Sequence, residues 1–440
     1  MDNPGEMVYF KGAMPILTLP YDARRTIRLA LPDRNFLGSA EQQRIPAAAD
    51  PVAEIRRALA APIGSPRLAE LARGKKRVTI AVTDLTRYCP DEMVAEAILN
   101  ELAGAGLAPS SITFVVGLGS HRAMTPAEIL AKLGPRVAER YRILNHAWRD
   151  DRTLVDLGTE NGFPIQVSRE VTDADLRITT GVIEPHLFAG YSGGAKTMVI
   201  GAGGHATIGA THGYPVLSHP TSRLGYADSI FRRFINAAGE RIGVEFVVNL
   251  VIDPGERLHR ALAGHPTAVY REGVAVARRV FEAPVPGMAD IVVSVPGPPK
   301  NLNLYQATRA CYPAILGPTP VLRPGGIVIV PTPCPDGVGD DFTRQWLSDA
   351  PDGPSIVEKA RRFGIPEGAH MGYRFGRFLI HASQVIITDC QIPPETIREL
   401  RLSSMPTVQE AVESAIGALG PDAGVLVIPH GVATLPVIAS

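Results

Sequence analysis

The stretch that decides the fold is Arg77–Ala105, which reads RVTIAVTDLTRYCPDEMVAEAILNELAGA. It begins with the β-branched run Arg77–Val82, which predicts a short buried strand. The polar segment Thr83–Pro90 follows the strand. Asp91–Ala105 then predicts a helix, because acidic residues occupy its first turn and a glycine lies at its end. A strand that leads into a helix is the repeating unit of a parallel sheet covered by helices.

The same alternation continues along the chain. Thr125 and Pro126 have the residue types of a helix start, and a helix is also expected through Tyr305–Ile315. Further strands are predicted at Ile112–Val116, Leu176–Thr180, Ile291–Val295, Ile327–Pro331, Val385–Thr388 and Val425–Ile428. The predicted fold class is α/β, with two α/β domains whose mainly parallel sheets face each other across an active-site cleft.

The expected domain boundaries follow from these elements. Residues 1–14 form a leader or tag-like segment, since they have no clear pattern. Residues 15–284 form an N-terminal α/β cofactor-binding domain, which residues 415–440 could complete. Residues 285–414 form a C-terminal α/β domain, and the proline-rich stretch Ala283–Met288 is the expected linker.

Composition excludes several classes of protein. The chain has 440 residues, enough for two or three domains, and a formal net charge of zero, which argues against a nucleic-acid surface. Its four cysteines are scattered, which fits neither a disulfide framework nor a thiolate zinc site and favours a reducing cytoplasm. No apolar run reaches the roughly 18–20 residues that span a bilayer.

Four polar clusters each follow a predicted strand. They are Asp84–Arg87, His121, Gly181–Gly213 and Lys300–Arg309. In parallel α/β sheets ligands bind beyond the carboxyl ends of the strands, so these clusters are the expected site.

The segment Gly181–Gly213 contains nine glycines, three histidines and one lysine. Glycines such as Gly193 and Gly194 allow a backbone to approach a ligand closely, and exposed amides in such loops bind anions. The segment lacks the spacing of a P-loop and the GxGxxG of a dinucleotide fold. A loop shaped only for tight turns is the alternative interpretation.

Three side chains of this segment have the chemistry of a site. His186 follows a predicted strand and could meet a substrate, and His212 could bind a metal through a neutral imidazole nitrogen. Lys196 could pair with phosphate or serve as a covalent attachment point if its amine is desolvated. Taken singly, each histidine is more often structural and a lysine more often solvated; His205 is an expected surface histidine.

His121 and Arg87 follow other strands. Two imidazoles from different loops, His121 and His186, suit proton transfer on opposite faces of a substrate. The planar fork of Arg87 can bind a carboxylate. Its alternative role is a salt bridge to Asp84 or Asp91, and Asp84 could instead cap the following helix.

A third polar group comes from the second domain. Tyr305, Gln306 and Arg309 follow a turn, and Tyr305 and Arg309 are four residues apart, which places them on one helix face. The N-terminus of a helix favours anions. The three residues therefore suit a hydroxy acid, although a solvated first turn is the alternative.

Taken together, these motifs resemble those of a known family. The stretch IEPHLFAGYSGGAK with IGATHG, preceded by TDLTRYCP and GLGSHRAMT and followed by NLNLYQATRA, is similar to the lactate racemase family. The resemblance covers nearly the whole chain from about Ile16, in the same order. It implies a racemase or epimerase of 2-hydroxy acids, an isomerase.

The resemblance also implies the cofactor, a nickel-pincer nucleotide whose nicotinate-derived ring holds nickel through carbon and two sulfurs. Lys196 would carry this nucleotide through a thioamide, and His212 would supply the remaining nickel ligand. Further cofactor contacts are expected from Asp84, Ser192, Gly193 and Gly194. Separate maturation enzymes would be transient partners.

The implied reaction is a reversible hydride transfer between the substrate and this cofactor, with His121 and His186 as the two acid–base groups. Arg87 matches a substrate-binding arginine, and Tyr305 and Gln306 match positions near the substrate. Where the family has a lysine for the carboxylate, this chain has Arg309, whose longer fork changes the pocket. The expected substrate is therefore a larger, dicarboxylic or aldonate-type 2-hydroxy acid rather than simply lactate.

Two other functions remain open at the level of sequence. An NAD-dependent 2-hydroxy acid dehydrogenase would use similar side chains, but it needs a dinucleotide fingerprint that the chain lacks. A non-catalytic carrier of the nickel cofactor would need Lys196 and His212 but neither His121 nor His186.

Overall fold

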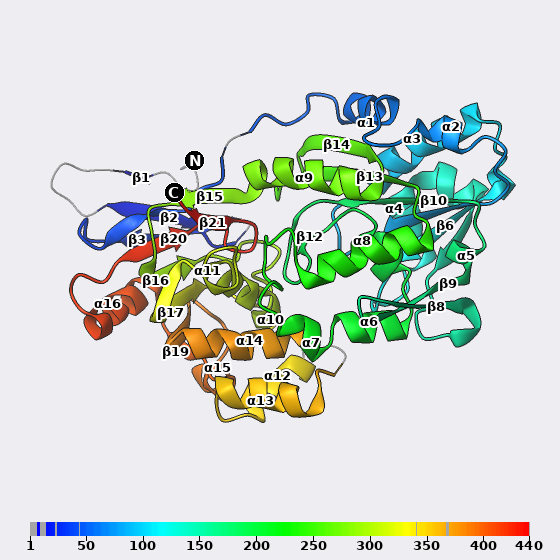
Figure 1. Cartoon of the computed structure of the whole chain (residues 1–440). Coiled ribbons are helices and arrows are strands. Elements are labelled where there is room, and N and C mark those ends of the chain that lie inside the picture. The colour runs from blue at the N-terminus through cyan, green and yellow to red at the C-terminus, as the bar shows by residue number, and fades with distance from the viewer. Residues whose placement is uncertain are drawn as a thin grey trace. The chain divides into compact units, whose positions relative to one another are not determined.

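The computed structural model describes residues 7–8, 15–22, 24–43, 45–339, 341–366 and 369–439. The chain divides into two compact units. The central unit comprises Arg44–Ser222 and Tyr226–Val280, and the terminal unit comprises Met1–Gln43, Arg223–Gly225 and Phe281–Ser440. Figure 1 shows the two units with their elements labelled. No helix in the described part of the chain is long and apolar enough to cross a lipid bilayer.

The central unit is built on a six-stranded sheet with the strand order β14-β13-β10-β5-β6-β7. Neighbouring strands are parallel except β13 and β14, which are antiparallel. The strands are β5 (Val78–Thr83), β6 (Ile112–Gly117), β7 (Arg142–Asn145), β10 (Leu176–Val182), β13 (Phe246–Ile252) and β14 (Leu258–Gly264). The predicted strands at Arg77, Ile112 and Leu176 are confirmed.

Alternate residues of these strands cover two different faces of the sheet. Ile80, Phe114 and Ile178 point into an apolar core shared with the helices α1 (Pro51–Ala60), α3 (Asp91–Gly104) and α4 (Pro126–Arg140). The helix predicted from Asp91 is therefore confirmed. Thr125 caps α4 by accepting from the Glu128 amide while the Glu128 side chain accepts from Thr125 N–H.

The opposite face of the sheet packs closely against the glycine-rich segment. Strands β5, β6 and β10 contact the π-helix η3 (Thr197–Gly201) of this segment. Helix η3 also contacts α8 (Ile230–Ile242). A Cβ added to Gly201 would lie 2.9 Å from the Cα of Gly117 at the end of β6. Only glycines at both positions allow this approach, which brings the segment after Lys196 against the carboxyl ends of the strands.

Smaller elements complete the central unit. Two antiparallel pairs are formed, one by β8 (Leu154–Glu160) with β9 (Phe163–Ser168), the other by β11 (Pro185–His186) with β12 (Gly190–Tyr191). The remaining helices are α2 (Leu68–Leu71), η1 (Pro109–Ser111), η2 (Asp151–Thr153), α5 (Arg169–Thr172), α6 (His205–Thr211), α7 (Tyr214–Leu217) and α9 (Pro266–Phe281).

The terminal unit has its own six-stranded parallel sheet, with the order β19-β18-β17-β16-β20-β4. Its strands are β4 (Phe36–Ser39), β16 (Ala289–Ser294), β17 (Leu322–Pro331), β18 (Gln384–Thr388), β19 (Ser403–Met405) and β20 (Val425–Ile428). The four strands predicted in this half of the chain are therefore confirmed.

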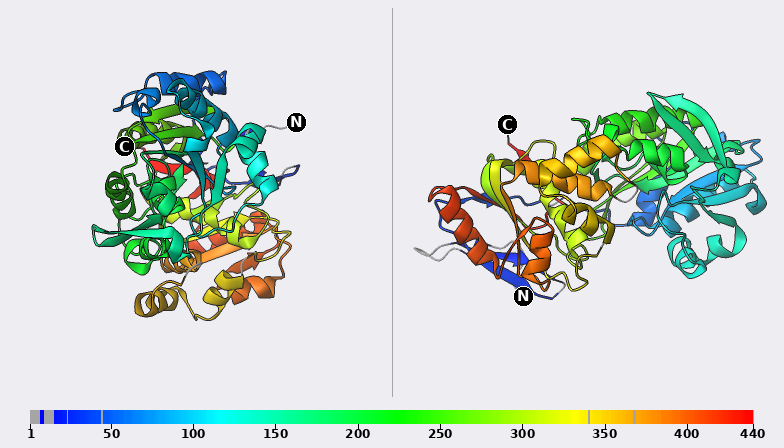
Figure 2. Two further views of the ribbon diagram at one scale, coloured as in Figure 1. Left: turned by 90° about the vertical axis from the view of Figure 1, so that its right-hand side faces the viewer. Right: turned by 90° about the horizontal axis from the view of Figure 1, so that it is seen from below.

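Both ends of the described chain belong to the terminal unit. The antiparallel strands β1 (Met7–Val8), β2 (Ile16–Pro20) and β3 (Thr26–Ala30) form a small sheet. Leucines of β2 and β3 share one apolar core with α16 (Val408–Leu419) and the large sheet. Figure 2 shows these blue strands and the red helix in the same unit.

The helix predicted through Tyr305–Ile315 is broken into three short pieces. They are α10 (Leu304–Ala307), the 3₁₀ helix η4 (Thr308–Cys311) and α11 (Tyr312–Ile315). Pro313 has no N–H to donate and its ring crowds the preceding turn, which explains the interruption. The other helices of this unit are α12 (Asp341–Ser348), α13 (Gly353–Phe363), α14 (His370–His381) and α15 (Pro394–Glu399).

The structure confirms the α/β class with mainly parallel sheets, but the units differ from the expected domains. Residues 15–43 contribute β2, β3 and β4 to the terminal unit, and 415–440 contribute strands to the same unit. The first residues of the expected linker Ala283–Met288 lie in β15 (Glu282–Val285), which pairs with β21 (Leu435–Ile438). The leader expected at 1–14 lies outside the described residues, apart from Met7–Val8 in β1.

Candidate functional site

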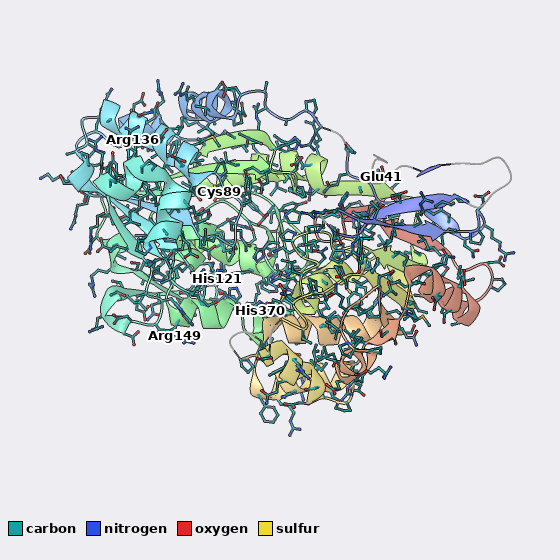
Figure 3. All side chains as sticks on the ribbon, turned by 180° about the vertical axis from the view of Figure 1, so that it is seen from behind. Glu41, Cys89, His121, Arg136, Arg149 and His370 are labelled. Atoms are coloured by element: carbon teal, nitrogen blue, oxygen red, sulfur yellow. The ribbon has the colours of Figure 1, made fainter. Side chains whose placement is uncertain are left out.

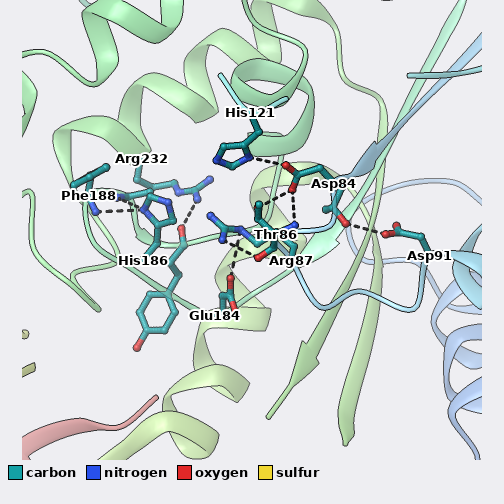
Figure 4. Close-up of polar contacts among 12 residues, drawn as sticks. Asp84, Thr86, Arg87, Asp91, His121, Glu184, His186, Phe188 and Arg232 are labelled. Atoms are coloured by element: carbon teal, nitrogen blue, oxygen red, sulfur yellow. Dashed lines mark hydrogen bonds and ion pairs between the residues drawn. The ribbon is translucent and has the colours of Figure 1, made fainter. Parts of the chain in front are cut away.

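The polar residues singled out in the central unit follow the carboxyl ends of three adjacent parallel strands. Asp84 follows β5, His121 follows β6, and His186 follows β10. Parallel neighbours end at the same edge of the sheet, so these loops come together. Figure 4 shows the resulting cluster, and Figure 3 labels His121 among all side chains of the chain.

Asp84 and His121 form a hydrogen-bonded acid–imidazole pair. His121 Nδ1 lies 2.6 Å from Asp84 Oδ2, while Thr86 donates its hydroxyl and its amide to Asp84 Oδ1 at 2.7 and 3.1 Å. Burial alone would raise the pKa of Asp84, but the hydrogen bonds from His121 and Thr86 outweigh it and lower the pKa. An ionised carboxylate only accepts, so His121 carries its proton on Nδ1 and its lone pair on Nε2.

Arg87 pairs with an acid that the sequence analysis did not consider. Its Nε lies 3.5 Å from Oε1 of Glu184, so the ion pair of Arg87 is with neither of the alternative partners, Asp84 and Asp91. Asp84 does not cap helix α3 either, because it accepts from Thr86 within its own turn. Glu184 is the only acid in Gly181–Gly213, and that isolation is the signal that could have identified it.

His186 lies in a strongly cationic and apolar surrounding. Burial, then the charges of Lys196 and Arg87, lower its pKa well below the ordinary value. Its Nδ1 accepts from the amides of Phe188 and Ala189, both at 3.3 Å. Backbone amides only donate, so the neutral ring carries its proton on Nε2.

His212 ends helix α6 and has the opposite tautomer. Its Nδ1 lies 3.0 Å from the carbonyl oxygen of Ile208, which only accepts, so the lone pair of the ring is on Nε2. Burial lowers the pKa of His212 to about 4, against the opposing effect of this hydrogen bond. A neutral imidazole with its lone pair on Nε2 is the form that binds metals.

Lys196 is half-buried at the start of η3. Burial lowers its pKa to about 7, helped by the charges of Arg87 and Arg232, while Glu184 and Asp84 oppose the shift. A large fraction of the amine is therefore neutral at physiological pH, and only the neutral amine is a nucleophile. Such a strongly shifted lysine in a polar cluster is the type of residue found at functional sites.

The turn before Lys196 depends on glycine. Gly193 has φ of 89° and Gly194 has φ of 60°, and a Cβ on Gly193 would lie 2.4 Å from Ile183 Cγ1. Asn249 Oδ1 accepts from the Gly194 amide at 2.7 Å. The hydroxyl of Ser192 is buried and has no hydrogen-bond partner among the described residues.

Arg232 of α8 hydrogen-bonds to this turn. The sequence analysis did not predict it as a residue of the site. Its side chain is buried and donates to the carbonyl oxygens of Gly193 at 3.0 Å and Tyr191 at 2.5 Å. Its guanidinium carbon lies 3.9 Å from the ring centre of Tyr270. Asn249 was missed as well, and both residues lie within otherwise ordinary strand and helix patterns.

The remaining predicted residues belong to the terminal unit. Asn303 caps α10 by accepting from the Gln306 amide at 2.9 Å, and the Arg309 guanidinium carbon lies 5.9 Å from the Tyr305 ring centre. Gln306 Oε1 and Arg309 Nε are buried without a hydrogen-bond partner in the described part of the chain. Tyr305, Gln306 and Arg309 thus form one polar group within this unit.

Two further observations concern the histidines. His205 is 45% exposed and lies 2.9 Å from Asp151, which confirms it as a surface residue. Across the residues that the structure describes, no three His, Cys, Asp or Glu side chains gather as a metal-binding group.

Comparison with known proteins shows that the chain is similar to two proteins named lactate racemase. The lactate racemase from Lactiplantibacillus plantarum is 30% identical over 436 residues, which cover 96% of this chain and 100% of that protein. The lactate racemase from Thermoanaerobacterium thermosaccharolyticum is 27% identical over 387 residues, covering 87% of this chain and 89% of that protein.

A solved structure and two family models give the same relationship. The lactate racemase apoprotein from Thermoanaerobacterium thermosaccharolyticum matches with a TM-score of 0.86 at 25% identity, covering 96% of this chain and 100% of that one. Models of the lactate racemase N-terminal and C-terminal domains match residues 21–225 and 286–436. The chain therefore belongs to the lactate racemase family, as its motifs indicated.

Proposed function

We propose that this chain is a racemase or epimerase of a 2-hydroxy acid and carries a nickel-pincer nucleotide on Lys196. The family makes it an isomerase acting on lactate-like hydroxy acids. The observation that supports the finer proposal is the amine of Lys196, whose pKa is lowered to about 7 by burial beside neutral His186 and His212. This combination suits covalent attachment of a cofactor and proton transfer in one cluster.

The residues present fit such a cofactor. Neutral Lys196 can be acylated, and the lone pair on His212 Nε2 is suited to nickel. The unpaired hydroxyl of buried Ser192 offers a hydrogen bond to the nucleotide. When bound, the cofactor would supply the acceptor for the C2 hydride.

The two acid–base histidines have different tautomers. His121 has its lone pair on Nε2 and a carboxylate on Nδ1, so it can take the substrate hydroxyl proton while Asp84 stabilises the resulting imidazolium. His186 presents Nε2–H and resists becoming charged, so it donates a hydrogen bond to the substrate oxygen. A racemase acts on both enantiomers, and to serve as the base for the other enantiomer His186 would have to change to the tautomer with its lone pair on Nε2.

Arg87 would bind the substrate carboxylate. Its present partner is Glu184 at 3.5 Å, a distance that leaves the guanidinium open to a closer, bidentate acid. Glu184 would keep the arginine oriented between turnovers and oppose the positive charge around Lys196.

The substrate is expected to have more polar groups than lactate. Buried Gln306 Oε1 and Arg309 Nε have no partner among the described residues, and a buried polar atom left unpaired costs about 1–3 kcal/mol. A carboxylate could accept from Arg309 Nε–H, whereas Gln306 Oε1 is an acceptor and needs a donor such as a hydroxyl. We therefore expect dicarboxylic or aldonate-type 2-hydroxy acids to react better than lactate.

The test uses the cofactor-loaded protein and a panel of enantiopure 2-hydroxy acids, analysed by chiral chromatography. Loss of optical purity without added NAD supports the proposal. NAD-dependent accumulation of a 2-keto acid would instead identify a dehydrogenase. A loaded protein inert toward the whole panel would favour the carrier role. If lactate reacts as well as the dicarboxylic and aldonate-type acids, the substrate preference inferred from Gln306 and Arg309 is wrong.

A further inference from the structure

A buried carboxylate lies directly beneath the loop that carries Asp84 and Arg87. Asp91, the first residue of α3, has no exposed surface. Its Oδ1 accepts from the hydroxyl of Thr180 in β10, and its Oδ2 accepts from the hydroxyl of Thr83 in β5, both at 2.8 Å. Figure 4 shows Asp91 on the other side of Asp84 from His121. Asp91 therefore links the ends of two strands that lead into the site.

Lys132 of α4 completes this group. Its side chain is 6% exposed, and its Nζ lies 2.8 Å from Asp91 Oδ2. The same ammonium donates to the carbonyl oxygen of Arg87 at 3.3 Å and approaches that of Cys89 at 3.5 Å. This buried cation thus contacts the backbone of the Arg87 loop, in addition to the hydrogen bond from the Arg87 amide to the Asp84 carbonyl oxygen at 3.3 Å.

Stability alone gives little reason for an ion pair here. Two charges removed from water lose much of their hydration, and a buried pair is often no more stabilising than apolar residues of the same volume. What this pair provides is position, because its ligands come from β5, β10, α4 and the Arg87 loop at once. Each ligand fixes one element relative to the others.

We propose that Asp91 and Lys132 are positioning residues for Arg87, which hold its loop so that the guanidinium meets the substrate carboxylate. This inference rests on the proposed function for its consequence in catalysis, but the restraint on the Arg87 loop is a property of the chain itself. Neither residue touches the reacting atoms, so their effect must pass through Arg87.

The first experiment measures the loop without any turnover. Phenylglyoxal modifies arginines, and peptide mass spectrometry of the cofactor-free protein follows each arginine separately. In Lys132→Met we expect Arg87 to react about fivefold faster, because its loop has lost its restraint. Arg152, which is 89% exposed, should react at an unchanged rate, and buried Arg232 should stay unmodified if the fold is intact.

Lys132→Met leaves the Asp91 carboxylate buried without its cation and can prevent folding. The double variant Asp91→Asn/Lys132→Met removes both charges, and it should show the same faster reaction of Arg87. Lys76→Met is the matched control, because Lys76 is exposed in the same unit. An unchanged rate at Arg87 in the folded double variant would overturn the proposal.

The second experiment is a cycle of substitutions in the loaded enzyme. Asp91→Asn/Lys132→Met should raise KM for the hydroxy acid about tenfold, change kcat less, and leave the mass increment on Lys196 intact. Combined with Arg87→Ala, it should raise KM no further, because the effect passes through Arg87. Additive effects would mean that the pair is only structural. A wild-type KM in Arg87→Ala would instead refute the role proposed for Arg87, leaving the labelling result to decide on the restraint.

Discussion

His121 and His186 follow neighbouring parts of one sheet, yet their surroundings prepare them for different states. The His121 side chain is 51% exposed and has a buried carboxylate on Nδ1. His186 is half-buried, has backbone amides on Nδ1, and is surrounded by Lys196, Arg87 and Arg232. The first surrounding fixes the ring proton on Nδ1, whereas the second lowers the pKa of the ring.

The contrast shows that the tautomer of each histidine is decided by what its Nδ1 contacts. A carboxylate acceptor leaves Nε2 of His121 ready to accept, whereas amide donors leave a proton on Nε2 of His186. Lys196 and His212 share the second surrounding, and both have lowered pKa values. Burial and neighbouring cations thus keep the bases at this end of the cluster neutral.

The largest expected effect comes from removing either ring. His186→Ala and His121→Ala should each lower kcat/KM by about 10³-fold, because each loses a proton-transfer group. The mass increment on Lys196 should persist in both. His205→Ala, at an exposed histidine outside the cluster, is the control and should retain full activity. Near-normal turnover in His186→Ala would mean that only one imidazole is needed.

A smaller effect is expected at the carboxylate that distinguishes the two rings. Asp84→Asn keeps the shape but removes the charge that stabilises protonated His121, so kcat should fall roughly 10–100-fold. Steady-state kinetics with both enantiomers would sharpen the comparison. If His121 serves mainly one direction, the loss should differ between the enantiomers, and equal losses would argue against distinct roles.

The neutral end of the cluster can be tested through Lys196. In cofactor-free protein, acetylation of Lys196 should rise with pH around a midpoint near 7, since the pKa is lowered to about 7. Arg87→Gln removes a cation that lowers this pKa, so the midpoint should move to higher pH. Peptide mass spectrometry over a pH series measures both. A midpoint above 9 in the wild type would contradict the neutral amine.

The smallest expected effect concerns the glycine turn. Gly193→Ala forces a side chain into positive φ and against Ile183, and it should lower the free energy of unfolding by about 2 kcal/mol. Gly162→Ala is a matched control, with φ of 81° but open space around the added carbon, and should lower it by about 1 kcal/mol. Urea unfolding compares the two, and equal losses would mean that Ile183 moves aside easily.

Local pattern allowed much of this protein to be predicted. The apolar run at Ile80 and the capping residues at Thr125 act within a few residues, so strands and helices near them are readable. The family motifs identified the lysine and the histidines as candidates. The Tyr305–Ile315 helix was misread because the effect of one internal proline was overlooked.

Only the tertiary structure determined which side chains meet. Arg87 contacts Glu184, and Asp91 contacts Lys132 and Thr180, across separations along the chain that no local pattern encodes. Arg232 lies in an amphipathic helix where nothing distinguishes it from a surface arginine. Backbone preference and hydrophobic periodicity are short-range and therefore legible in the sequence. Burial, charge and proton position depend on neighbours that only folding brings together, and these set the state of every base in the site.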